Sequence, residues 1–251
     1  MKRNHHIPGT ARTAVRLRGY SLLEMLIAVS IFSIVTAAVF EQINAMQKRS
    51  ASEAMKLDQS QQSREFLDQT VRDLHMAGYP NSTMYSGSPD NTDPRVAAGL
   101  VAVSPTQILM EGDVNSEGQV YSVNISYVAA DPNDPNCPCV RRFAVPKVPG
   151  DPQAQPTATN YTEATQVFPP GTGPGASGED LFTFFDANGT QVDVSGGANI
   201  AQPADPLYGM TTIARIKAVK INLSLLTNQR DPATGASMQT SMSATARLAQ
   251  R

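Results

Sequence analysis

The stretch GYSLLEMLIAVSIFSIVTAAVF, residues 19–40, decides the fold of this chain. Between Gly19 and Glu41 it carries a single charged side chain, that of Glu24. An α-helix rises about 1.5 Å per residue, so roughly 20 apolar residues span the hydrocarbon core of a bilayer. Residues 20–40 are therefore long and apolar enough to form one membrane-spanning helix. A carboxylate inside such a helix costs about 2.5–3.5 kcal/mol on insertion scales, so we expect Glu24 to have a specific partner.

A basic segment precedes this helix. Residues 1–18 contain no acid and carry five cationic side chains, those of Lys2, Arg3, Arg12, Arg16 and Arg18. Cationic flanks of apolar segments stay on the cytoplasmic side, so the rest of the chain is predicted to cross outward. In an ordinary secretory signal the cleavage site follows the apolar region, which is then lost. Here a cut before the apolar run would leave the anchor in the mature protein.

The ordered residues Gly19, Tyr20, Ser21, Leu22 and Glu24, behind a basic leader, resemble the class III signal of type IV pilins and type II secretion pseudopilins. That family more often has Phe where this chain has Tyr20. The resemblance implies that a prepilin peptidase cleaves between Gly19 and Tyr20 and methylates the new amine of Tyr20. It also implies that Glu24 of one subunit pairs with this amine on a neighbour. Such a buried pair can specify the axial register of two helices.

The resemblance also implies the fold, which is of the α+β class. In the type IV pilin fold a long N-terminal hydrophobic helix packs on a C-terminal antiparallel β-sheet head with long loops. We therefore expect a cleaved leader at residues 1–19 and a transmembrane and filament-core helix at 20–41. An amphipathic continuation of the helix is expected at 42–78, and a β-rich periplasmic head at 79–251.

The residues themselves support a helix that continues beyond the membrane. No glycine or proline occurs in residues 20–76, so nothing in the sequence ends the helix there. In its later half Leu67, Val71 and Leu74 recur at helical spacing and predict a core-facing stripe. Between the two apolar regions, residues 59–63 read Gln-Ser-Gln-Gln-Ser and are polar on all sides. That stretch is expected either to lie weakly against the sheet or to be solvated.

Short apolar and alternating segments predict the strands of the head. They lie at residues 97–103, 107–110, 119–128, 140–145, 219–225 and 238–248. Residues 146–179 are instead rich in Pro, Gly, Thr and Ser and contain few large apolar side chains. Such a segment buries little surface, so we expect an exposed and mobile excursion. It would be either a solvated insertion or a contact surface for another subunit.

Two apolar runs flank Asn188-Gly189 within residues 181–194. Asn-Gly between two such runs is the strongest short-range signal for a β-hairpin, because both residues tolerate positive φ. The oxygen-bearing side chains of Asp186, Asn188 and Asp193 also suggest a calcium loop, although the EF-hand spacing with its terminal Glu is absent. A hairpin turn and a weak calcium site both stay open, and no other metal or cofactor is expected.

The two cysteines, Cys137 and Cys139, are separated by a single proline. The compartment outside the inner membrane permits disulfides, but a one-residue gap is unfavourable for a bridge. A local bridge and two free thiols therefore both stay open. A zinc site is not expected, because loss of the leader leaves His75 as the one histidine and four ligands cannot be assembled.

Composition and motifs narrow the class of function. Basic and acidic residues number 20 and 22, so no nucleic-acid partner is expected. An enzyme is not expected either, since the chain offers no convincing nucleophile–base–acid set and no phosphate-binding loop. What remains is a structural or interaction protein.

The resemblance names that role more closely. It implies a PilW-type minor pilin that primes type IV pilus assembly, held in the inner membrane by one helix with a periplasmic head and later carried into the pilus. The alternative is a J-type pseudopilin at the tip of the type II secretion pseudopilus. A pilus-tip adhesin or DNA-uptake factor is a third reading. The implied partners are other minor pilins, the major pilin, the prepilin peptidase, the inner-membrane assembly platform and the membrane itself.

Overall fold

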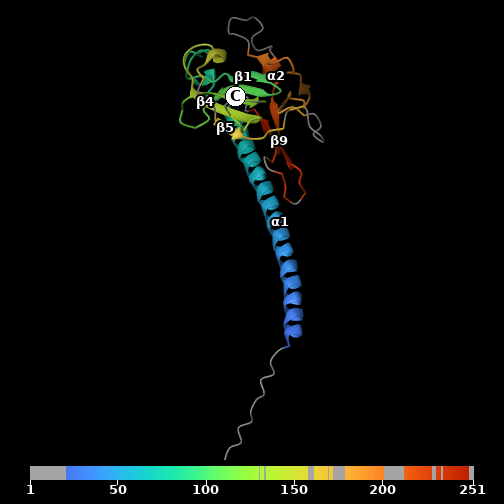
Figure 1. Cartoon of the computed structure of the whole chain (residues 1–251). Helices are drawn as coiled ribbons and strands as arrows, with labels where there is room; N and C mark the ends of the chain where they lie inside the picture. The colour runs from blue at the N-terminus through green and yellow to red at the C-terminus, as the bar shows by residue number, and fades with distance from the viewer. Residues whose placement is uncertain are drawn as a thin grey trace, which may run out of the picture. The chain divides into compact units, whose positions relative to one another are not determined.

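A computed structural model describes residues 21–129, 131–132, 134–157, 161–168, 170–171, 179–200, 212–227, 230–232 and 234–248. The chain divides into two compact units, with the boundary between Gln47 and Lys48. A single helix, α1 (Leu22–Met76), contributes to both units (Figure 1). The expected processing residues Gly19 and Tyr20 lie outside the described residues.

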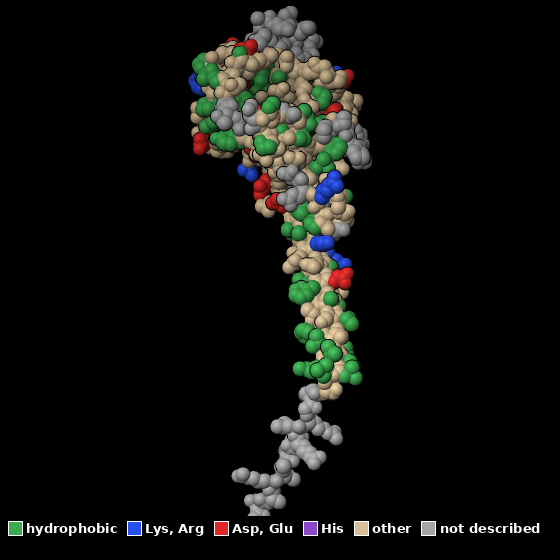
Figure 2. Space-filling view, in the orientation of Figure 1, with side chains coloured by type: hydrophobic (Ala, Val, Ile, Leu, Met, Phe, Trp, Pro, Cys, Tyr) green, Lys and Arg blue, Asp and Glu red, His purple; other side chains and the backbone are tan. Residues whose placement is uncertain are grey.

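In the first unit α1 presents apolar side chains on all sides. Its large hydrophobic residues from Leu22 to Met46 are exposed, and the helix is long and apolar enough to cross a membrane. Figure 2 shows these side chains along the first part of α1. Two serines in this stretch donate back to the helix, Ser30 Oγ to Leu26 O and Ser33 Oγ to Val29 O, each at 2.8 Å. These hydroxyls therefore need no outside partner in an apolar medium.

The second unit contains two antiparallel sheets. The first has the strand order β5-β4-β3-β2-β1-β8 and the second the order β10-β9-β6-β7. The strands of the first sheet are β1 (Gly99–Ser104), β2 (Gln107–Gly112), β3 (Tyr121–Val128), β4 (Cys139–Pro146), β5 (Tyr161–Ala164) and β8 (Ala198–Asn199). Those of the second are β6 (Phe182–Phe185), β7 (Gln191–Val192), β9 (Ala218–Leu226) and β10 (Gln239–Arg247). The short helices among the described residues are η1 (Ser82–Met84), η2 (Pro152–Ala154) and α2 (Thr212–Arg215). An α+β fold with an apolar N-terminal helix and antiparallel sheets is thus confirmed.

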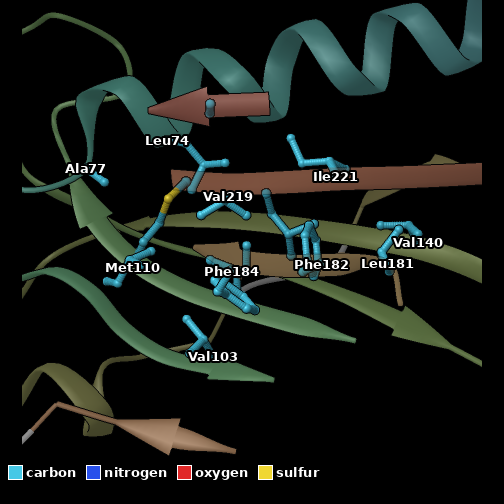
Figure 3. Close-up of a cluster of buried hydrophobic side chains, with 14 of the residues drawn as sticks. Leu74, Ala77, Val103, Met110, Val140, Leu181, Phe182, Phe184, Val219 and Ile221 are labelled. Atoms are coloured by element: carbon cyan, nitrogen blue, oxygen red, sulfur yellow. The ribbon is translucent and has the colours of Figure 1, made fainter. Parts of the chain in front are cut away.

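One hydrophobic core joins the last turns of α1 to both sheets. In Figure 3, Leu74 of α1 lies above Met110 of β2, and Phe184 of β6 and Val219 of β9 lie in the same cluster. All four side chains are almost completely buried. The shared core explains why this part of α1 has an apolar stripe, whereas the first unit is apolar all round.

The outcome for the predicted helix stripe is clear. Leu67 and Leu74 are buried and Val71 packs partly against the core, as predicted. The polar stretch at residues 59–63 lies against protein on one side only: Gln59 and Ser63 are buried, whereas Gln61 is exposed, so each alternative holds for part of the stretch.

The expected excursion at residues 146–179 is wrong for a large part of its length. Within it, β5 pairs with β4, and Ala164 and Val167 are almost completely buried. An isolated bridge also joins Val167 to Leu225 of β9. Few apolar residues are needed here because backbone hydrogen bonds to an existing strand offset much of the ordering entropy.

Candidate functional site

The candidate site at the start of α1 is a carboxylate on an apolar surface. Glu24 lies in the first helical turn and is exposed, and the helical hydrogen bonds begin with Met25 N donating to Ser21 O at 3.1 Å. Glu24, Ile27 and Ile31 line one shallow hollow along the helix, three and four residues apart. A negative charge in the first turn is favoured by the helix dipole. The arrangement presents one anionic acceptor on a face that is otherwise apolar.

This geometry limits the environment that can satisfy Glu24. In lipid, or against other apolar helices, an unpaired carboxylate is costly and is retained where a cation or a hydrogen-bond donor meets it. Tyr20 lies outside the described residues, so the position of an amine at that residue is not part of the structure. The described residues supply the acceptor and the apolar surface around it.

The cysteine pair lies beside an acidic loop in the second unit. A disulfide joins Cys137 to Cys139. Ligand-type atoms of these cysteines and of Asp134 lie within 4.8 Å of one another. However, both sulfurs are used in the bridge, and Asp134 Oδ2 accepts from Arg141 Nη2 at 3.0 Å. Hydrogen bonds from the backbone of Asn136 and from Arg141 also hold the pKa of Asp134 below its usual range. The cluster therefore acts as a cross-linked, ion-paired loop.

The hairpin around Asn188-Gly189 is present, with β6 paired to β7. Gly189 has φ of 79°, and Asp186 N donates to Thr190 O at 2.9 Å. Asp186 Oδ1 accepts from Asn188 N and Thr190 N at 2.8 and 2.9 Å. Asp193 Oδ1 similarly accepts from Ser195 N at 2.9 Å. These carboxylates cap their own turns, which favours the hairpin over the calcium loop as the reason for the acidic residues.

Sequence reasoning missed two buried ion pairs, of which the first is Glu111 with Lys147. Both side chains are fully buried, and Lys147 Nζ donates to Glu111 Oε2 at 2.6 Å. The same ammonium donates to Asn91 O and Val96 O at 2.6 and 2.8 Å, and Ala98 N donates to Glu111 Oε2 at 2.9 Å. Burial raises the pKa of Glu111 although Lys147 opposes the shift. The pair ties β2 and the residue after β4 to the loop that follows α1.

The second pair joins α1 to the first sheet. Asp73 Oδ2 accepts from Arg142 Nε of β4 at 2.8 Å, and Asp73 Oδ1 accepts from Gln69 Nε2 at 2.8 Å. Asp73 is fully buried, and burial raises its pKa against the influence of Arg142. No sequence signal marks either pair, because the partners lie 36 and 69 residues apart.

Comparison with known proteins bears on the N-terminal site. Residues 16–40 match the family model of the prokaryotic N-terminal methylation motif, a match that spans Gly19, Tyr20 and Glu24. Neither a curated protein nor a solved structure matches the chain. The motif, the apolar helix and the antiparallel sheets together support a type IV pilin-like protein in general. The motif implies processing by a prepilin peptidase and assembly with the pilin machinery.

Proposed function

We propose that this chain is a PilW-type minor pilin that primes type IV pilus assembly. The observation that carries the proposal is Glu24, an exposed acid in the first turn of an apolar helix, within a matched methylation motif. The long connections of the head, such as residues 77–98 between α1 and β1, favour a minor role. The role is structural, and no catalytic residue is proposed.

The mechanism exchanges one apolar environment for another. The helix is first stabilised in the inner membrane, with the head in the periplasm. A prepilin peptidase cuts between Gly19 and Tyr20 and methylates the amine of Tyr20. During extraction the apolar surface of α1 leaves lipid and packs against the helices of the major pilin and other minor pilins. Glu24 then pairs with the amine of an adjacent subunit, so that one axial offset between helices is favoured over its neighbours.

The first experiment is mass spectrometry of the N-terminus in cells with and without prepilin peptidase. We expect a methylated Tyr20 terminus with the enzyme and an intact leader without it. The second experiment compares Glu24→Ala with Glu41→Ala in sheared pili. Glu41 is an exposed acid on the same helix, beyond the apolar run, and is a matched control. We expect loss of incorporation for Glu24→Ala alone.

The same cells separate the pilus from its alternative. Deletion of a priming minor pilin should lower the number of surface pili, and expression of the wild-type chain should restore it. Loss of protein secretion with normal piliation would assign the chain to the type II secretion pseudopilus as a J-type pseudopilin. Retention of residues 1–19 in the mature protein would contradict both readings.

A further inference from the structure

The sheets of the second unit end in edges of very unequal length. Among the described residues, β5 and β8 bound the first sheet, and β7 and β10 bound the second. The edge strand β5 has four residues, and β7 and β8 have two each. In contrast β10 has nine residues, paired with β9 in an unbroken register. Only β10 therefore offers, within the described part of the chain, an edge long enough to pair with a complete strand.

The hydrogen-bond pattern shows which groups of β10 point outward. Thr227 N donates to Met238 O, and Leu248 N donates to Lys217 O, each at 2.9 Å. In an antiparallel ladder the bonded positions alternate, so even-numbered residues of β10 bond to β9. The N–H and C=O groups of the other positions face away from β9 and have no backbone partner among the described residues. These positions, all with exposed side chains, are Gln239, Ser241, Ser243, Thr245 and Arg247.

This edge lacks the features that usually protect edge strands. Natural edges are shortened or carry prolines, bulges or inward-pointing charges that prevent pairing with another chain. β10 has no proline and no bulge, and its one charge, Arg247, stands at its end. Small hydroxyl side chains at the middle outward positions leave the backbone accessible. The edge is thus built as a template for strand pairing.

The inner face of β10 is held in place by α1. Thr240 Oγ1 donates to Gln59 Oε1 at 3.0 Å, and Ser52 Oγ contacts Met238 Sδ at 3.8 Å. Ala246 near the other end is fully buried in the core. A strand fixed on its inner face and on its β9 side loses little further entropy when a new strand pairs with it.

We propose that the outer edge of β10, which Figure 1 draws in red, accepts an extended strand from a different subunit of the same assembly. The strand adds to the second sheet by main-chain hydrogen bonds, with uncharged residues opposite the hydroxyl row. An acidic residue of the partner lies opposite Arg247, the exposed arginine at the end of β10. This inference rests on the proposed function, because the partner is another component of the filament.

A second copy of this chain does not fit the edge. Another β10 strand, whether parallel or antiparallel, contains no acidic residue and so offers no counter-charge for Arg247. The other edges that a copy offers among the described residues, β5, β7 and β8, have at most four residues. The occupant is therefore a strand from a different protein.

The test uses the full chain with Ser243→Pro, and Ser243→Ala as the matched control. Proline at position 243 removes an outward N–H and no bond to β9, so the head should fold and the leader should be cleaved normally. Ser243→Ala keeps the N–H. We expect Ser243→Pro to lower incorporation into sheared filaments about tenfold, equivalent to one or two backbone hydrogen bonds, and Ser243→Ala to leave it unchanged.

Two further measurements do not depend on proline. Arg247→Glu should lower incorporation, whereas Arg230→Glu, at an exposed arginine outside the strand, should not. Amide exchange at Ser241, Ser243 and Thr245 should slow at least about tenfold from the detergent-solubilised chain to the filament. Wild-type incorporation of Ser243→Pro, or unchanged exchange at these amides, overturns the strand pairing. Absence of the wild-type chain from filaments overturns the proposed function itself.

Discussion

Replacement of Lys147 by Met removes the cation from a fully buried pair and keeps a side chain of similar length. Lys147 Nζ donates to Glu111 Oε2, Asn91 O and Val96 O, so one substitution removes three charge-assisted hydrogen bonds. Glu111 then keeps the bond from Ala98 N, while its Oε1 already has no hydrogen-bond partner among the described residues. Removal of one member of a buried ion pair costs about 3–5 kcal/mol, because the other charge is left uncompensated. We expect the unfolding free energy of the head to fall by that amount.

The cost should depend on pH, since Glu111 can take up a proton. Burial raises the pKa of Glu111 above its ordinary value in the folded wild-type chain. At a pH between the ordinary pKa of a Glu and the raised pKa of folded Glu111, the folded state binds more protons than the unfolded state. Stability therefore falls as pH rises through that interval. In Lys147→Met the cation no longer opposes the effect of burial, so the pKa of folded Glu111 rises further and this pH interval extends upward. The destabilisation should therefore be largest at neutral pH and smaller in acid, where Glu111 is neutral.

A double-mutant cycle separates the pair from its members. Lys147→Met with Glu111→Met replaces both charges by apolar groups and should cost clearly less than the sum of the two single changes. Lys220→Met is the matched control, because Lys220 pairs with Glu179 at an exposed site and should contribute less than about 1 kcal/mol. Urea unfolding followed by pulse proteolysis of the detergent-solubilised chain gives the free energies. A cost below 1 kcal/mol for Lys147→Met, or strict additivity in the cycle, would refute this reasoning.

Three other predictions use the same assay. Burial raises the pKa of Asp73, so wild-type stability falls as pH rises above the ordinary pKa of an Asp. Asp73→Asn should therefore flatten the pH dependence of stability, and an unchanged slope contradicts this. Gly112→Ala should cost about 1–3 kcal/mol since a Cβ there meets the backbone of Met76, whereas Gly196→Ala, in open space, should cost little; equal costs would contradict the close approach. Asp186→Ala should cost about 1 kcal/mol through loss of its turn caps, with or without added Ca²⁺, and stabilisation of the wild-type chain by Ca²⁺ would restore the calcium reading.

The sequence predicted the elements whose signals are local. The absence of glycine and proline from residues 20–76 predicted α1, and alternation in residues 219–225 predicted β9 with its buried face. Asn188-Gly189 predicted the β6–β7 hairpin because its turn chemistry involves a few adjacent residues. In each case the signal lies in residues that are close together in the sequence.

Features that depend on distant partners could not be predicted. The division into two sheets places β6 beside β9, so the chain leaves the first sheet, builds part of the second, and returns to pair β8 with β1. The order within residues 146–179 was missed for the same reason: β5 is specified by the free edge of β4, not by its own composition. Glu111 and Lys147 likewise look like ordinary surface residues until the fold brings them together.

The polar residues in the middle of α1 reconcile two demands on one helix. A continuous apolar stripe from Phe40 to Phe66 would lengthen the membrane span beyond the bilayer and favour tilt or mismatch. The apolar run ends at Glu41, and the polar residues Ser52, Gln59 and Ser63 that follow are nevertheless buried in the second unit. Beside Ser52 and Gln59 little apolar surface is buried between α1 and β10, so the hydrogen bond between Gln59 and Thr240 helps to set the register there. Because such bonds are directional, this contact fixes the position of β10 more closely than an apolar seam would, as its proposed role as an acceptor edge requires.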